Sequence, residues 1–141
     1  MHNELPAAET TPTGRVLQIV FYERISQNAK WGDQNHPNVE TVLTQRPGGC
    51  TPERMAEEYG IPSAMRAKYM CQKAAREGEP TWAHILVEEV AEAIEAATHL
   101  DRAAHLDSDA FDALRQRLHA ELIQTAAVAV AWAEKIGGAD K

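Results

Sequence analysis

Residues 81–100, TWAHILVEEVAEAIEAATHL, decide the fold class of this 141-residue chain. Apolar residues recur there at steps of three and four, which is the spacing of an amphipathic helix, and no glycine or proline interrupts them. Thr81 is a typical N-cap residue, so the sequence predicts a helix from Trp82 to about Leu100. Its expected apolar face comprises Trp82, Ile85, Leu86, Ala93, Ala97 and Leu100.

A second long helix is expected directly after the first. Ser108 is the expected N-cap, and the helix runs over about residues 109–136 until Gly137 and Gly138 end it. Because the connection is short, we expect the two helices to be antiparallel neighbours. The expected apolar face comprises Leu114, Leu118, Leu122, Thr125, Ala126, Ala129, Trp132, Ala133 and Ile136.

Shorter helices are expected nearer the N-terminus, at segments that begin with capping residues or lack helix breakers. Their expected ranges are 15–30, 52 to about 59, and 64–77. Residues 33–50 contain several prolines and glycines and are expected to form a loop, in which VETVLT at 39–44 is the best strand candidate. The sequence therefore predicts an all-α fold, with a disordered tail over residues 1–14 and a single domain over residues 15–138.

Composition and charge exclude several classes of protein. Fourteen Lys and Arg against twenty-one Asp and Glu give a net charge of −7, which argues against binding to a nucleic-acid backbone. No apolar run approaches the roughly 20 residues of a membrane span, and the N-terminus does not resemble a secretion signal. Cys50 and Cys71 form no clustered metal motif, so we expect a cytoplasmic protein with reduced thiols.

The glutamates of EEVAEAIE, residues 88–95, are separated by their angles around the predicted helix. Glu89 falls inside the border of the apolar face and Glu92 just outside it, whereas Glu88 and Glu95 point further away. Two carboxylates as close as Glu89 and Glu92 repel each other unless a positive charge lies between them. Mg²⁺, which prefers oxygen ligands, is the expected cation.

The second long helix offers a matching pair, Glu121 and Gln124, beside its apolar stripe. If the helices are antiparallel, three carboxylates and one amide oxygen face each other across the seam. The alternative, a solvated acidic face, stays open at this point. A di-iron bundle is a poor fit, because no histidine of this region follows a glutamate by three residues.

These segments resemble the MazG-like nucleoside triphosphate pyrophosphohydrolases. EEVAE at 88–92, followed by ELIQ at 121–124 and AAVAVAW at 126–132, is similar to that family's EExxE and ExxD helices, and ERISQNAKWGDQNH at 23–36 is similar to the N-terminal stretch of its phage and bacterial members. The resemblance implies an all-α bundle that binds Mg²⁺, with Mn²⁺ as a substitute. It also implies cleavage of a nucleoside triphosphate between the α and β phosphates.

The resemblance assigns roles to individual residues. Glu89, Glu92 and Glu121 match the family's metal-binding carboxylates, and Glu88 or Glu92 is expected to polarise the attacking water. Gln124 stands where the family has Asp, and an amide offers an oxygen ligand but no charge. This departure leaves open a second reading, a nucleotide-binding or regulatory protein with weak or no turnover. A third reading is a helical interaction module whose glutamates are solvated.

A pocket for the base is expected around Trp31, whose ring can stack on a base and whose neighbours Lys30, Gln34 and His36 are polar. The alternative is that Trp31 fills a gap in the core. Lys68, with Arg66 and Lys73, is expected to reach phosphates, the alternative being an ordinary solvated face.

The run AAVAVAWA at 126–133 is apolar on nearly all sides of its helix, which favours burial on all sides. A second copy of the chain can cover the flank that the first long helix leaves open. We therefore expect a homo-oligomer, and the resemblance implies a homodimer or homotetramer.

Overall fold

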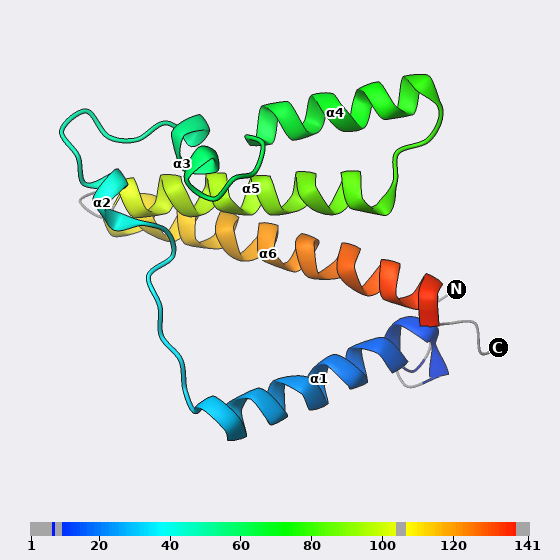
Figure 1. Cartoon of the computed structure of the whole chain (residues 1–141). Coiled ribbons are helices and arrows are strands. Elements are labelled where there is room, and N and C mark those ends of the chain that lie inside the picture. Colours follow the sequence, from blue (N-terminus) through cyan, green and yellow to red (C-terminus); the bar gives the residue numbers. More distant parts are fainter. Residues whose placement is uncertain (1–6, 8–9, 104–106, 138–141) are drawn as a thin grey trace, which may run out of the picture. The chain divides into compact units, whose positions relative to one another are not determined.

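The computed structural model describes residues 7, 10–103 and 107–137. Within these residues all regular secondary structure is helical, so the predicted all-α fold is confirmed (Figure 1). No helix in the described part of the chain is both long and apolar enough to cross a membrane. The helices are α1 (Pro12–Trp31), α2 (Thr41–Thr44), α3 (Pro52–Glu58), α4 (Ala64–Glu77), α5 (Trp82–Arg102) and α6 (Ser108–Gly137).

The chain divides into two compact units. One comprises Met1–His36 and Ala129–Lys141, and the other comprises Pro37–Val128. The first unit therefore contains α1 and the end of α6, while the second contains α2 to α5 and most of α6. The single domain expected over residues 15–138 stays a prediction.

Helix α1 begins at Pro12, three residues before its predicted start. The Thr11 side chain caps it by accepting a hydrogen bond from the Gly14 backbone N–H at 2.9 Å, and proline suits the first turn because it has no N–H to satisfy. The tail predicted over residues 1–14 is thus wrong at its C-terminal end. Its residues 1–6 and 8–9 lie outside the described residues.

Helices α3, α4 and α5 begin at the residues that their caps predict. The side chains of Thr51, Ser63 and Thr81 each accept a hydrogen bond from the backbone N–H three residues later. At α5 the bond is reciprocated, because the His84 ring nitrogen Nδ1 accepts from the Thr81 N–H at 3.1 Å. These starts depend only on local chemistry, which explains why they were predictable.

Helix α6 has a different cap from the one predicted. The Asp107 carboxylate, rather than Ser108, accepts hydrogen bonds from the backbone N–H groups of Asp109 and Ala110, both at 3.1 Å. An aspartate at this place also complements the positive end of the helix dipole. The helix therefore starts at Ser108, one residue earlier than expected.

The segment over residues 33–50 contains the short helix α2, so the strand candidate at 39–44 is wrong. Val39 and Leu43 are four residues apart, and both are buried in the core. The Thr44 hydroxyl donates to the Asp101 carboxylate at the end of α5. Leu43 and Thr44 are adjacent and both buried, which a helical turn allows, whereas a strand would direct them to opposite faces.

The core of the second unit lies where α2, α3 and the loop before α3 pack on α5. Gly49 in that loop has φ +75°, and a Cβ there would lie 2.9 Å from the Arg102 guanidinium, so glycine is required. Arg102 donates to the Cys50 carbonyl at 2.9 Å and ties the loop to α5. The buried cluster is Val39, Leu43, Cys50, Met55 and Ala97, with Ile94 and Leu118 packed against it.

Helix α5 is the centre of this unit, and α2, α3 and α4 all contact it. Burial therefore extends beyond the single face predicted for it. Its buried residues are Ala91, Ala93, Ala96, Ala97, Thr98 and Leu100, which are mostly small and allow close approach of neighbouring helices.

Helices α5 and α6 are antiparallel neighbours, as predicted. The Thr125 hydroxyl donates to the Glu89 carbonyl at 3.3 Å, and the Arg117 guanidinium lies 2.8 Å from Nδ1 of His99. As the residue number increases along α5, the number of the facing residue on α6 decreases. This pairing brings the acidic residues of the two helices together.

Candidate metal centre

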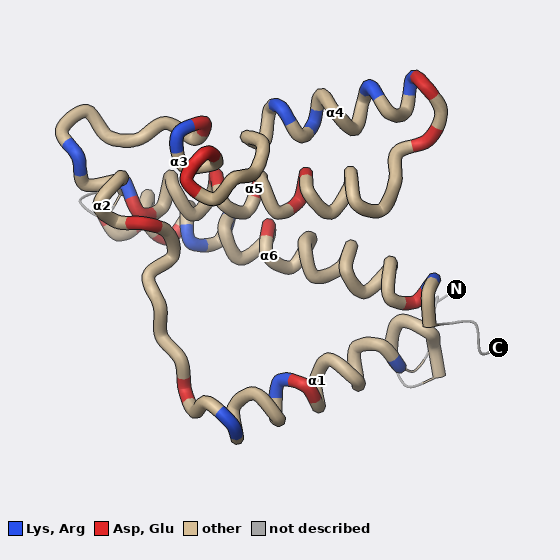
Figure 2. Tube along the Cα trace, viewed as in Figure 1, with Lys and Arg blue, Asp and Glu red and all other residues tan. Residues whose placement is uncertain are grey.

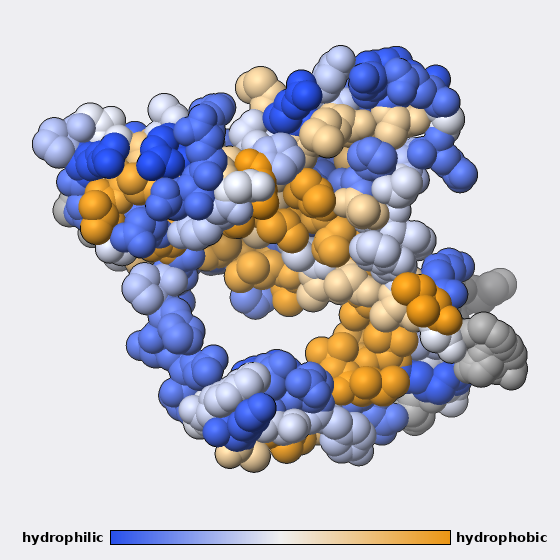
Figure 3. Space-filling view, viewed as in Figure 1, coloured by the Kyte–Doolittle hydropathy of each residue, from blue (hydrophilic) through white to orange (hydrophobic). Residues whose placement is uncertain are grey.

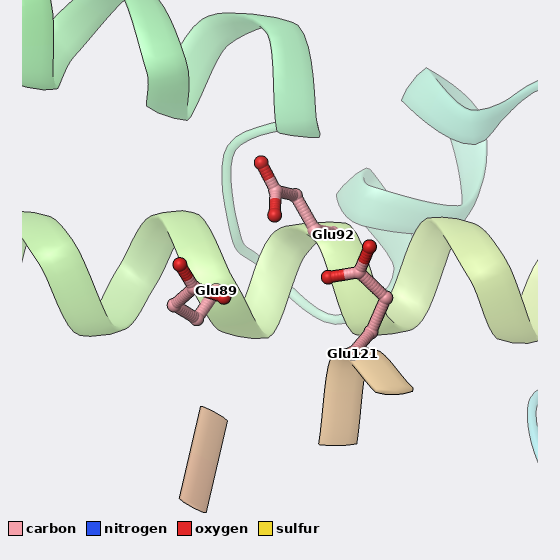
Figure 4. A group of neighbouring side chains, drawn as sticks. All are labelled: Glu89, Glu92 and Glu121. Carbon is pink, nitrogen blue, oxygen red and sulfur yellow. The ribbon is translucent and has the colours of Figure 1, made fainter. Parts of the chain in front are cut away.

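Three carboxylates from α5 and α6 converge at the seam between these helices. Glu89 and Glu92 lie one turn apart on α5, and Glu121 projects toward them from α6 (Figure 4). One carboxylate oxygen of each residue can be chosen such that all three lie within 4.8 Å of one another. The structure therefore brings together the three carboxylates that the sequence singled out.

Two of the carboxylate oxygens have no hydrogen-bond partner. An oxygen of Glu89 and one of Glu121 are buried and accept no hydrogen bond from any described residue. A buried carboxylate oxygen without a partner is costly, since it has lost water and gained nothing in exchange. A proton or a cation between the side chains removes this cost.

The electrostatics of the cluster favour protonation when no cation is bound. Burial, together with the negative charges of Glu121, Glu89 and Glu88, raises the pKa of Glu92 to about 7. Burial also raises the pKa of Glu89, with smaller contributions from the charges of Glu121 and Glu88. Groups with such perturbed pKa values are typical of functional sites.

Glu88, one of the two expected candidates for polarising water, lies toward Cys71 of α4 and outside the group of three. Burial, a hydrogen bond to Glu88 and the charges of Glu88, Glu89 and Glu92 raise the pKa of the Cys71 thiol to about 11. That thiol donates to the His84 carbonyl at 3.2 Å. Cys71 therefore stays protonated at neutral pH and acts as a packing residue.

Gln124 is exposed on α6, one turn beyond Glu121. The predicted fourth ligand is thus more open to solvent than the three carboxylates, each of which is half-buried. Its role as a ligand stays a prediction.

A pocket of about 470 Å³ adjoins two of the three carboxylates, Glu92 and Glu121. Lys68 of α4 lines it, and its expected contact to phosphates stays a prediction. Arg66 and Lys73 instead line a separate pocket of about 440 Å³ on the other side of α4. Helix α4 carries mainly basic residues and helix α5 mainly acidic ones, so the two helices have opposite net charge (Figure 2).

Three further residues line this pocket and were not predicted to do so: Glu53, Glu95 and Arg117. Glu95, which was expected to point further from the apolar face, lies outside the group of three carboxylates but lines the pocket, where α3 and α4 form a second wall. Arg117 precedes Glu121 by four residues, and this helical spacing is the signal that would have found it.

The residues expected to bind the base lie in the other unit. Lys30, Trp31, Gln34 and His36 are all exposed, and the Lys30 ammonium lies 5.0 Å from the centre of the Trp31 ring. With 54% of its surface exposed, Trp31 does not fill a gap in the core. The base pocket itself stays a prediction.

Comparisons with known proteins gave no relative of this chain. No protein-family model, curated protein or solved structure matches it significantly. The resemblance to MazG-like proteins therefore rests on the quoted motif residues.

Proposed function

We propose that the chain is a Mg²⁺-dependent nucleoside triphosphate pyrophosphohydrolase, which releases a nucleoside monophosphate and pyrophosphate. The observation that carries the proposal is the convergence of Glu89, Glu92 and Glu121, with two buried carboxylate oxygens that lack partners. A set of oxygen donors with this much negative charge fits a hard divalent cation, and Mn²⁺ can substitute for Mg²⁺.

Each residue has a distinct part in the proposed reaction. Glu89, Glu92 and Glu121 would hold the cation, which neutralises charge on the phosphates and orients them for attack. Glu92 and Glu88 are the candidates to accept the proton of the attacking water.

The resemblance suggests the proposed substrate class, a nucleoside triphosphate, and the net charge is compatible with it. A net charge of −7 disfavours a nucleic-acid partner, which contacts a large surface. A single nucleotide is small enough to contact a few basic residues only. Lys30, Trp31, Gln34 and His36 are the proposed contacts to the base and sugar, and Lys68 is a proposed contact to phosphate. The reaction and the reduced cysteines suit a cytoplasmic protein.

A screen of canonical and modified nucleoside triphosphates, with Mg²⁺ present, tests the proposal by measuring pyrophosphate release. We expect release that requires the divalent cation and disappears in Glu89→Gln. Hydrolysis that yields orthophosphate alone, or activity that is unchanged in Glu89→Gln, would contradict it.

A nucleotide-binding protein without turnover is the second candidate. Gln124, which stands where the resembled family has Asp, favours it because an amide brings no charge to the metal site. This candidate predicts Mg²⁺-dependent binding of a triphosphate in the same screen, with no release of pyrophosphate.

A further inference from the structure

The pocket beside the acidic cluster is lined by two cations that lie on different helices. Lys68 comes from α4 and Arg117 from α6, and both share the pocket with Glu92 and Glu121. Its volume of about 470 Å³ is comparable to that of a small-ligand site. Cations and carboxylates in one cavity can bind a metal ion at one end and an anion at the other.

Neither of these cations forms a direct ion pair with the carboxylates of the pocket. Among the described residues the ion pairs are Arg54–Glu58 and Arg115–Asp112, and neither includes Lys68 or Arg117. Yet four glutamates line this pocket: Glu53, Glu92, Glu95 and Glu121. Both cations therefore keep donors for a ligand.

A histidine holds the arginine in place. Nη1 of Arg117 lies 2.8 Å from Nδ1 of His99, and a guanidinium can only donate, so the imidazole accepts through that nitrogen. The remaining N–H groups of Arg117 stay available. Guanidinium N–H groups in a fixed fork match phosphate oxygens in pairs.

We propose that Lys68 and Arg117 bind the phosphate chain of a metal–polyphosphate in this pocket, and that His99 positions Arg117 for it. The inference rests on the proposed function, because it places the cation on Glu89, Glu92 and Glu121. Lys68 and Arg117 add positive charge beside the phosphates, which one divalent cation bound to three carboxylates does not neutralise. The recognised chemistry is thus a chain of at least two phosphates rather than a single phosphate.

Thermal unfolding with inorganic pyrophosphate as the probe tests this inference in two stages. Mg²⁺ alone is added first, and pyrophosphate is then added with Mg²⁺ kept in excess. We expect each addition to raise the Tm of the wild-type protein, because both ligands bind the folded state. Orthophosphate in place of pyrophosphate is expected to add little.

Lys68→Gln and Arg117→Gln are expected to keep the Mg²⁺ step and to lose about tenfold in pyrophosphate affinity, the value of a charge-assisted hydrogen bond. Matched controls lie on the same helices: Lys73 lines the other pocket, and Arg115 pairs with Asp112 at 3.3 Å. Lys73→Gln and Arg115→Gln should retain both steps. Arg117→Lys, which keeps the charge and loses the fork, should fall between.

The positioning role of His99 has its own variants. His99→Leu removes the acceptor and should weaken pyrophosphate binding with the Mg²⁺ step intact. His99→Gln, whose amide oxygen can accept from Arg117, should restore it.

The outcomes separate this inference from the proposed function. If Mg²⁺ alone does not raise the Tm of the wild-type protein, the metal site is wrong, and with it both proposals. An intact Mg²⁺ step with unchanged pyrophosphate affinity in Lys68→Gln, Arg117→Gln and Arg117→Lys would overturn the phosphate site alone.

Discussion

Glu92 combines partial burial with three acidic neighbours, so its protonation is linked to folding. Its pKa is about 7 in the folded chain and near 4.5 when solvated. Between these values the unfolded chain releases a proton that the folded chain retains. Without divalent cations, the contribution of Glu92 to stability is therefore full below about pH 4.5 and is lost as the pH rises through about 7.

Urea unfolding at a series of pH values, with a chelator present, measures this linkage. Glu92→Gln should be more stable than the wild type above pH 7. Its free energy of unfolding should also decrease much less than that of the wild type as the pH rises through about 7. Glu95→Gln, on the same helix but outside the group of three, is the control. Excess Mg²⁺ should abolish the wild-type decline, because the cation then replaces the proton; a decline that persists in Glu92→Gln argues against the assignment.

Gln124→Asp tests how much metal affinity and activity the amide of Gln124 costs beside Glu121 on α6. The carboxylate adds a charge that the amide lacks, so we expect tighter Mg²⁺ binding and faster pyrophosphate release. Steady-state kinetics at several Mg²⁺ concentrations measure both. Slower turnover would mean that the site is built around the amide.

At the scale of elements, the caps of α3, α4 and α5 were predictable because a capping side chain and its N–H partner are close in sequence. The seam between α5 and α6 followed from helical periodicity. The second wall of the site did not, because Glu53 and Glu95 meet the pocket only through the packing of α3 and α4 on α5. Helix α2 was missed because its four residues are too short for periodicity to reveal.

The cap of α6 gives a prediction for a single element. Asp107→Ala removes the acceptor for two backbone N–H groups and should cost about 1 kcal/mol of unfolding free energy. Ser108→Ala should cost much less, since Ser108 is not the cap. Urea unfolding compares the two variants, and equal losses would contradict the assignment of the cap.

At the scale of the whole molecule, α1 carries many exposed large hydrophobic residues, and such patches often mark interaction sites. Its exposed large hydrophobic residues include Leu17, Ile19, Phe21, Tyr22 and Ile25, which lie in several directions around the helix axis. Figure 3 shows hydrophobic side chains gathered over part of α1. On α6, Ala126, Ala127, Ala129 and Ala133 of the run at 126–133 are also exposed.

We therefore propose, in line with the resemblance, that the chain forms a homodimer or homotetramer. Light scattering at micromolar concentration should give a multiple of 15.6 kDa. Phe21→Lys, at a site 60% exposed, should shift the mass toward the monomer, whereas Gln18→Lys should not. A stable monomer in the wild type would rule out this assembly.

The central claim is that Glu89, Glu92 and Glu121 form one divalent-cation site, and thermal unfolding with Mg²⁺ or Mn²⁺ tests it most directly. A ligand at about 100 times its Kd stabilises the folded state by about 2.7 kcal/mol, so a Tm rise of several degrees is expected. Glu89→Gln should abolish that rise, while Glu95→Gln should keep most of it. A Tm that does not respond to millimolar Mg²⁺ or Mn²⁺, or a full response in Glu89→Gln, would contradict the account.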